Sequence, residues 1–327
     1  MNWSVIKNKV DLSNSIFTLM KAHTIIITAI CLTAAAGCNA VKDIAGPDPV
    51  VDPIEKDDRI PIRISSSVTK VADDDFENGD AVGIYVVNGF EDGSGTWQPG
   101  SLLTSGNHLD NVKYTLSGTE WKADGDYYWK DSRTQAEFYC YYPRKESVDD
   151  LENVAYDIAS DQSSKAAFCG AEILWGKTTL TAPTEESVRI GTTHRMSQIA
   201  ISVVPGRGYT QETLMADINS IKIKGLKCGA LLNLTNGVLT ATGDEADITP
   251  YFDGSTYRAM IVPQAVIGKD LISITVGGIE RILNQSIEFS SNSRKKCTLT
   301  ITRINEGINV GIGGWEDDNT DYGGVLN

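Results

Sequence analysis

The stretch AVGIYVV, residues 81–87, decides the fold, because this apolar run lies between two turn signals, Asn78-Gly79 and Asn88-Gly89. Asn-Gly is a strong turn signal, since both residues accept the backbone angles that a tight turn needs. A short apolar run between such turns is typical of a β-strand. Residues 81–87 therefore predict one strand of a sheet whose strands are joined by turns.

The same arrangement recurs on both sides of this stretch. Strands are predicted at residues 60–64, 111–116, 126–129, 136–142, 187–190, 198–204, 220–226, 229–234, 237–241, 257–262, 271–276, 286–289 and 297–304. Residues 210–219 come closest to a helical period, with Thr210 as the candidate N-cap. Parallel sheets need helices between their strands, so the sequence predicts an all-β protein built of sandwiches.

The chain is long enough for two domains of ordinary size. We expect an N-terminal β-sandwich over residues 59–186 and a C-terminal β-sandwich over residues 187–327. The charged loop at residues 183–186 marks this division, and the glycine-rich loop at residues 205–208 is the alternative.

The N-terminal region carries a secretion signal. Residues 24–38, TIIITAICLTAAAGC, follow a short basic flank. Their apolar core is shorter than the roughly 20 residues of a membrane-spanning helix and fits a signal peptide. Small residues then lead to Cys38, as in a bacterial lipobox, although Ala35 stands where Leu or Ile is usual. We expect residues 1–37 to be an upstream extension and lipoprotein signal peptide, and Cys38 to be lipidated; cleavage without lipid is the alternative.

The composition limits the partners. Residues 38–58 are rich in proline and acidic residues and predict an extended tether. The formal net charge is −14 and no run of Lys or Arg suggests a nucleic-acid surface, which argues against nucleic acid. The four cysteines beyond the tether form no C-x-x-C pair, so a zinc site is not expected. They are Cys140, Cys169, Cys228 and Cys297. Buried free thiols are preferred over disulfides.

Catalytic motifs are weak. His108 and His194 are isolated, no G-x-S-x-G elbow occurs, and the S-x-x-K match at residues 67–70 lacks its companion motifs. Acidic clusters, such as Asp124 with Asp126, lack the EF-hand pattern, so solvated turns are preferred over calcium sites. We expect no enzymatic activity, no cofactor and no metal.

Aromatic residues are frequent in the first half of the chain. They are Trp97, Trp121, Tyr127, Tyr128, Trp129, Tyr139, Tyr141 and Tyr142. Strands favour aromatic residues, so packing is the preferred explanation. The alternative is a surface lipoprotein that binds glycans through these aromatics.

A family resemblance follows from the order of several short motifs. In chain order they are Phe76-Glu77-Asn78-Gly79-Asp80, Val82-Gly83-Ile84-Tyr85, Tyr128-Trp129, Phe138, Tyr141-Tyr142-Pro143, His194-Arg195-Met196-Ser197, Tyr257-Arg258-Ala259, Val262-Pro263-Gln264 and Trp315-Glu316-Asp317-Asp318. This order behind a lipobox resembles the fimbrillin (Mfa-like, type V pilus) family of Bacteroidales. The resemblance runs from about residue 60 to the end.

The resemblance implies two transthyretin-like β-sandwiches in an outer-membrane lipoprotein that becomes a non-enzymatic fimbrial subunit or a tip or accessory adhesin. In this family an arginine-specific protease removes the first strand, and a terminal strand of another subunit fills the groove. Here Ile60, Ile62 and Ile64 match the strand to be removed, since they alternate as groove-filling residues do. Pro61 indicates an edge position for that strand.

The processing site departs from the family pattern. Arg59 and Arg63 lie before or within the first strand, and Lys70 stands in the following loop, where the family carries arginine. The candidate processing residues are therefore these three.

The C-terminal donor strand also has a candidate. Ile308, Val310 and Ile312 alternate well, but the residues after Trp315 are acidic and glycine-rich. Either this stretch is donated, or the chain is a tip, accessory or anchor-like subunit that only accepts a strand. The implied partners are other fimbrial subunits, membrane lipid through Cys38, and a host or bacterial surface protein or glycan.

Overall fold

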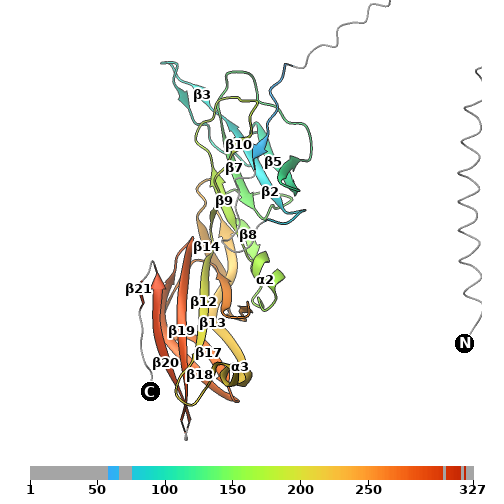
Figure 1. The fold of residues 1–327 in the computed structure, drawn as a ribbon. Helices are drawn as coiled ribbons and strands as arrows, with labels where there is room; N and C mark the ends of the chain where they lie inside the picture. Colours follow the sequence, from blue (N-terminus) through green and yellow to red (C-terminus); the bar gives the residue numbers. More distant parts are fainter. Residues whose placement is uncertain (1–57, 66–75, 305–306, 318–319, 322–327) are drawn as a thin grey trace, which may run out of the picture. The chain divides into compact units, whose positions relative to one another are not determined.

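A computed structural model describes residues 58–65, 76–304, 307–317 and 320–321. These residues form twenty-one strands and two short helices, which confirms the all-β prediction (Figure 1). The strands are β1 (Ile64–Ser65), β2 (Ala81–Asn88), β3 (Phe90–Glu91), β4 (Trp97–Gln98), β5 (Leu109–Ser117), β6 (Glu120–Ala123), β7 (Ala136–Tyr142), β8 (Val154–Asp157), β9 (Leu174–Lys177), β10 (Val188–Arg189), β11 (Thr193–His194), β12 (Ser197–Pro205), β13 (Ile218–Leu232), β14 (Leu239–Ile248), β15 (Tyr251–Phe252), β16 (Tyr257–Ile261), β17 (Gln264–Val276), β18 (Ile279–Phe289), β19 (Ser293–Ile304), β20 (Gly307–Asp317) and β21 (Thr320–Asp321). The helices are α2 (Lys165–Gly170) and α3 (Gln211–Asp217).

The stretch AVGIYVV forms β2, near the centre of a six-stranded antiparallel sheet with the order β11-β9-β7-β2-β5-β6. Its side chains alternate between two cores. Val82, Ile84 and Val86 face one core, whereas Tyr85 and Val87 face another. The run is apolar at every position because both faces of the sheet are covered at this strand.

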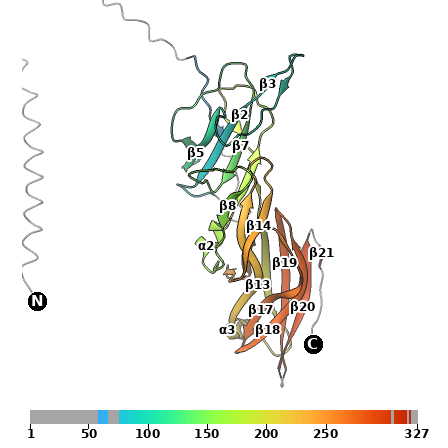
Figure 2. The same cartoon turned by 180° about the vertical axis from the view of Figure 1, so that it is seen from behind.

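The second half of the chain contains a β-sandwich. One layer has the order β15-β16-β12-β19-β20-β21 and the other has the order β14-β13-β17-β18 (Figures 1 and 2). Ile199 of β12 and Leu299 of β19 belong to the same buried core as Ile223 of β13 and Ile272 of β17. Residues of both layers therefore interdigitate in one apolar core.

Strong contacts cross the predicted division at residue 186. Strand β8 pairs with β13, and the indole Nε1 of Trp175 donates to the carbonyl oxygen of Leu234 at 2.8 Å. The core around Tyr85 also contains Leu232 and Met260. The described residues belong to one compact unit. The division into two sandwiches stays a prediction. The structure shows in addition that residues on both sides of residue 186 share one core.

Several elements differ from the sequence prediction. The stretches at residues 220–226 and 229–234 form the single long strand β13, which continues through Gly225 with a register shift in its pairing to β14. Residues 126–129 form only an isolated bridge at Tyr128. The elements that were not predicted are short and lack a clear period. They are strands β3, β4, β6, β8, β9, β11, β15 and β21 and helix α2.

Helix α3 confirms the predicted N-cap. The hydroxyl of Thr210 accepts from the backbone N–H of Thr213, and the Thr213 side chain accepts from Thr210 in return. No helix among the described residues is long and apolar enough to cross a bilayer. Residues 1–57, with the predicted signal peptide, Cys38 and all but the last residue of the tether, lie outside the description.

The tight packing at Gly176 of β9 gives a first prediction. A methyl group on Gly176 would collide with the carbonyl oxygen of Gly191, whereas one on Gly170 would meet nothing within 4 Å. We expect Gly176→Ala to lower the free energy of unfolding by about 1–3 kcal/mol. Gly170→Ala is the control and should change it by less than about 0.5 kcal/mol. Urea unfolding followed by tryptophan fluorescence measures both, and equal effects would contradict the packing described here.

Buried thiols give a second prediction. Cys140 and Cys297 are buried, and burial raises the pKa of each to about 12. We expect both to resist iodoacetamide at pH 8 in the folded protein and to react in urea, with half-buried Cys169 as the internal comparison. Because the unfolded thiols ionise first as pH rises above about 9, these residues should lower stability at alkaline pH. Peptide mass spectrometry reads out the labelling, and rapid native alkylation of Cys140 would contradict its burial.

Candidate strand-exchange site

Residues 60–65, near the start of the described part of the chain, are bonded to residues 127–129 on one side. The backbone N–H of Ile62 donates to the carbonyl oxygen of Tyr127 at 2.8 Å, and the N–H of Trp129 donates to the carbonyl oxygen of Ile60 at 2.9 Å. Pro61 lies between these bonds in an isolated bridge with Tyr128. Proline has no N–H, so it fits this position only because its nitrogen is not required as a donor.

The other side of the segment faces β10. Ile64 and Ser65 form β1, which pairs in parallel with Val188 and Arg189. The N–H of Val188 also donates to the carbonyl oxygen of Arg63 at 2.7 Å. The partner therefore changes along the segment: Ile60 and Ile62 bond to residues 127–129, whereas residues 63–65 bond to β10 in a two-stranded sheet. The edge position that Pro61 predicts stays a prediction. The continuous strand expected at residues 60–64 is reduced, since only β1 forms a ladder.

The side chains of this segment follow the predicted alternation. Ile62 and Ile64 are 7% and 6% exposed and belong to the core formed on one face of the first sheet, and Ile60 packs against the same core. Arg63 points the other way, and its Nη1 donates to the carbonyl oxygen of Glu185 at 2.7 Å. Burying an isoleucine side chain contributes about 1.5–3 kcal/mol. The isoleucines are therefore the main apolar contacts of the segment.

A cavity of about 550 Å³ adjoins this segment. Tyr114, Trp121 and Tyr127 line it together with residues 61–64. The hydroxyl of Tyr114 is buried there without a hydrogen-bond partner, and burial raises the pKa of Tyr114. The segment thus fills only part of its groove. Sequence analysis did not foresee that residues 127–129 and β10 form the walls, although both stretches were predicted as strands.

The candidate processing residues are placed as follows. The guanidinium carbon of Arg59 lies 3.8 Å from the ring centre of Tyr128. Arg63 is held by its side chain and by its carbonyl oxygen, as described above. Lys70 lies outside the described residues. Both arginines are therefore engaged in contacts within the folded chain.

The candidate donor stretch lies within its own sheet. Ile308, Val310 and Ile312 belong to β20, which pairs with β19 in antiparallel register. Val310 is opposite Ile301 in this ladder, and β21 follows β20 at the end of the sheet. The backbone of the stretch is thus already hydrogen-bonded within this chain.

The two histidines have unrelated surroundings. The Nε2 atom of His108 is 2.7 Å from the carbonyl oxygen of Tyr128, whereas the Nδ1 atom of His194 is 3.2 Å from Oε1 of buried Glu172. Neither contact involves a serine or cysteine nucleophile. Within the part of the chain that the structure describes, no three His, Cys, Asp or Glu residues are placed to hold a metal ion.

The aromatic residues of the first half mostly pack inside. The members that are less than a tenth exposed are Trp121, Trp129, Tyr139, Tyr141 and Tyr142. Phe76 contacts two of them edge-on, Trp121 at 5.0 Å and Tyr142 at 5.2 Å between ring centres. This confirms packing as the explanation, and it removes the buried members from any glycan platform.

Comparison with known proteins gives the family of this chain. Residues 69–315 match the model of the fimbrillin-like family. The chain belongs to this family. The fimbrillin-like chain is also 24% identical over 317 residues to a proposed fimbrium subunit, Fim1C, of Bacteroides uniformis, with 92% of this chain and 97% of that protein covered.

Two crystal structures share the fold of this fimbrillin-like chain. A proposed cell adhesion protein of Bacteroides uniformis superimposes with a TM-score of 0.61 at 22% identity, covering 80% of this chain and 98% of that chain. A proposed cell adhesion protein of Bacteroides ovatus gives a TM-score of 0.60 at 15% identity, covering 79% of this chain and 98% of that chain. Both likenesses show the fold that the fimbrillin-like chain shares with these proteins.

The burial of the first segment gives a third prediction. Ile62→Ala and Ile64→Ala should each lower the free energy of unfolding by about 2–4 kcal/mol, because each leaves a cavity in the core. Arg63→Ala is the control from the exposed face and should cost about 1 kcal/mol or less. Chemical denaturation measures all three. If the isoleucine variants cost no more than the arginine variant, the segment does not depend on its apolar side chains.

Proposed function

We propose that this protein is a non-enzymatic subunit of a surface fimbrium that accepts a strand of another subunit in place of residues 60–65. The observation that carries the proposal is the way this segment is held. Its alternate isoleucines are buried, and few backbone hydrogen bonds join it to the two walls of its groove. Such a segment is suited to replacement by another strand with apolar side chains at every second position.

The groove offers matching chemistry to an incoming strand. Removal of residues 60–65 would free the carbonyl oxygen of Tyr127 as an acceptor and the N–H groups of Trp129 and Val188 as donors. It would also uncover apolar side chains of the core, including Trp121. Main-chain bonds would then supply affinity, and apolar pockets would fix the register.

Removal of the segment requires a cut after it. Arg59 and Arg63 are engaged in contacts within the folded chain, and the carbonyl of Arg63 is paired with Val188. We therefore place the processing site in residues 66–75, where Lys70 is the single basic residue. A protease that accepts lysine fits this stretch of sequence better than one restricted to arginine.

The donor is proposed to be the β20 stretch of another copy. Ile308, Val310 and Ile312 repeat the spacing of the isoleucines at residues 60–64. Because β20 pairs with β19 in its own chain, donation would exchange that ladder for one in a neighbour. A tip or accessory subunit would keep β20 in place and only accept a strand.

Export and anchoring complete the proposal. The apolar stretch before Cys38 and the tether after it support a lipoprotein held in the outer membrane, with residues 59–327 presented at the cell surface. Other fimbrial subunits are the proposed partners.

Limited proteolysis tests strand exchange. Protein beginning at residue 39 is treated with trypsin, and its size is followed by light scattering. We expect a cut after Lys70, loss of residues 60–65 and formation of multimers, because the open groove accepts a strand. Lys70→Ala should prevent both trimming and assembly. A trimmed chain that stays folded and monomeric, and binds no added peptide of residues 306–317, would contradict the proposal.

Two further samples separate the possible roles. Excess peptide of residues 58–66 should block assembly of trimmed protein by filling the groove. Trimmed Val310→Asp should bind the peptide of residues 306–317 but fail to extend chains if β20 is the donor. Binding of that peptide without any self-assembly of the trimmed wild-type protein would identify a subunit that only accepts.

A further inference from the structure

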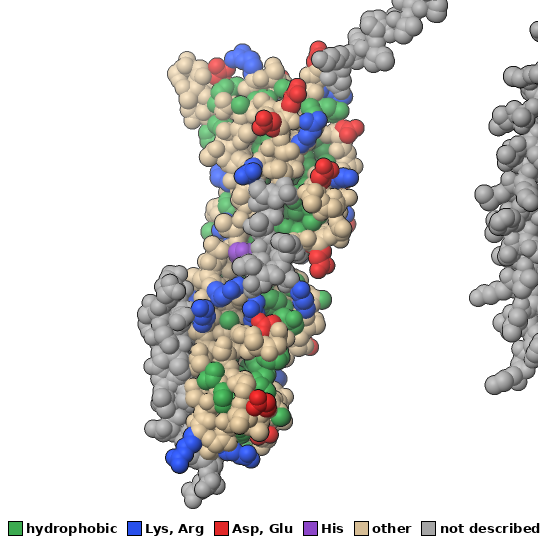
Figure 3. All heavy atoms as spheres, viewed as in Figure 1, with side chains coloured by type: hydrophobic (Ala, Val, Ile, Leu, Met, Phe, Trp, Pro, Cys, Tyr) green, Lys and Arg blue, Asp and Glu red, His purple; other side chains and the backbone are tan. Residues whose placement is uncertain are grey.

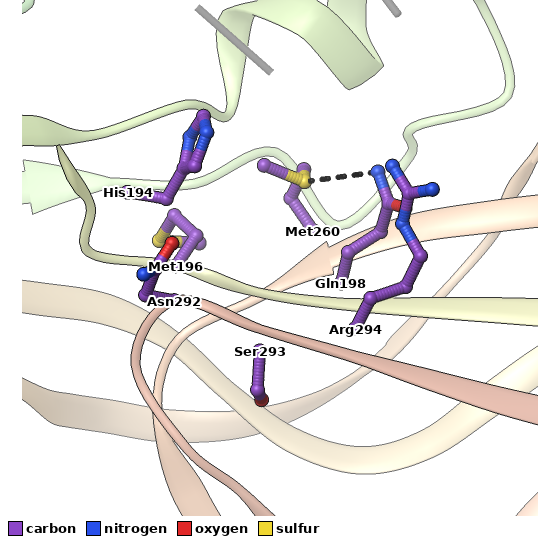
Figure 4. Close-up of a pocket in the computed structure, with 7 residues that line it drawn as sticks. All are labelled: His194, Met196, Gln198, Met260, Asn292, Ser293 and Arg294. Carbon is purple, nitrogen blue, oxygen red and sulfur yellow. Dashed lines mark hydrogen bonds between the residues drawn. The ribbon is translucent and has the colours of Figure 1, made fainter. Parts of the chain in front are cut away.

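A second cavity, of about 330 Å³, lies on the outer face of the sheet that contains β12. Its floor is a row of three cross-strand neighbours: Met260 of β16, Gln198 of β12 and Arg294 of β19. His194 and Met196 line the other end (Figure 4). None of these residues belongs to the strand-exchange groove, so the cavity is a separate site.

The amide of Gln198 is a buried polar group in this cavity with an unsatisfied oxygen. Gln198 is only 5% exposed. Its Nε2 contacts the sulfur of Met260 at 3.9 Å, and its Oε1 has no hydrogen-bond partner (Figure 4). A buried amide oxygen without a partner costs about 1–3 kcal/mol. A ligand that donates a hydrogen bond to Oε1 would recover this cost.

Arg294 is the arginine among the described residues that line the cavity. Arg294 is exposed at one end, and no acidic residue is among the described residues that line the cavity. In the next row of the same face, Ala200 lies between Arg258, which forms an ion pair with Asp253 at 2.7 Å, and Lys296, which is opposite Glu316 of β20. Figure 3 shows Lys and Arg side chains gathered over this part of the sheet. An anionic group is therefore favoured at the Arg294 end.

The walls of the cavity are fixed in advance. The side chain of Gln162 is fully buried and bonds to both backbone groups of Met260, at 2.9 Å to the oxygen and 2.8 Å from the nitrogen. At the opposite end, the N–H of Asn292 donates to the carbonyl oxygen of Met196 at 3.0 Å. Oε1 of buried Glu172 lies 3.2 Å from Nδ1 of His194. A ligand would bind without the entropic cost of ordering these groups.

We infer that this cavity binds one acidic sugar residue. Its carboxylate or sulfate would accept hydrogen bonds from Arg294, and a hydroxyl or amide group of the sugar would donate to Oε1 of Gln198. The C–H face of the ring would pack against the thioethers of Met196 and Met260. The cavity is at the small end of ligand sites, which suits a single sugar and not an extended peptide.

This inference goes beyond the proposed assembly and does not depend on it. It also differs from the glycan site considered from the sequence. That site used the aromatics of the first half, whereas this one lies on the outer face of the β12 sheet. The acid could be a carboxylate, as in sialic and uronic acids, or a sulfate ester. Both share the same contact with Arg294.

The test uses untrimmed protein beginning at residue 39, so that strand exchange does not intervene. Saturation-transfer NMR and calorimetry compare N-acetylneuraminic acid, glucuronic acid, galactose 6-sulfate and neutral galactose. We expect at least one acidic sugar to bind and galactose to bind at least about tenfold more weakly, since one charged hydrogen bond is worth about 1.5–3 kcal/mol. The preferred acid distinguishes the carboxylate source from the sulfate source.

Variants assign the binding to this cavity. Arg294→Ala should lower the affinity for the acidic sugar about tenfold. Lys296→Ala removes the same charge two residues along the same strand and should change that affinity by less than about twofold. Gln198→Leu removes the hydroxyl contact, and Gln198→Glu adds a repelling charge, so both should reduce binding. Melting curves confirm that each variant is folded, and the Arg294 and Lys296 pair decides the assignment if a Gln198 variant unfolds.

Several results would overturn the inference. The first is that none of the acidic sugars binds at 20 mM, although a Kd of about 1 mM is expected. The others are that galactose binds as tightly as the acidic sugars, and that the Arg294 and Lys296 variants have equal effects. Cyclohexanecarboxylate tests the sugar itself, because it has the acid and the apolar ring but no hydroxyl groups. If it binds as tightly as the acidic sugars, the cavity recognises an apolar acid and not a sugar.

Discussion

The burial of both faces of the first sheet at β2 and β7 is the constraint on which the structure depends. Even-numbered residues of these strands, such as Ile84 and Cys140, face one core, and odd-numbered residues, such as Tyr85 and Tyr141, face another. Each face therefore needs a cover. Residues 60–65 help to cover the first face. Strand β8 and residues from the second half of the chain cover the other.

The two covers differ in how they are attached. The cover from the second half includes a strand of a larger sheet, since β13 pairs with β8, β14 and β17. The cover from residues 60–65 is a short segment, and the burial of two isoleucine side chains supplies much of its attachment. An apolar face that must be covered, but whose cover is short, is the physical basis on which replacement by another chain is proposed.

Much of the fold was predictable from local pattern. The boundaries of β7 and the cap of α3 at Thr210 follow directly from the residues there. The partners of residues 60–65 were not predictable, because a pairing such as Ile64 with Val188 joins positions far apart in the chain. The cavity at Gln198 was missed for the same reason: its floor depends on the register of three strands, and a glutamine within an apolar strand gives no local signal of what lies opposite.

The pair of hydrogen bonds between the Gln162 side chain and the backbone of Met260 has a mechanical consequence. Together with the indole contact of Trp175 to Leu234, it joins segments on either side of residue 186 by side chains held inside a common core. A pulling force along the chain would load these bonds in parallel with β8 and β13, so tension would pass through the body of the protein instead of a single stretch of peptide.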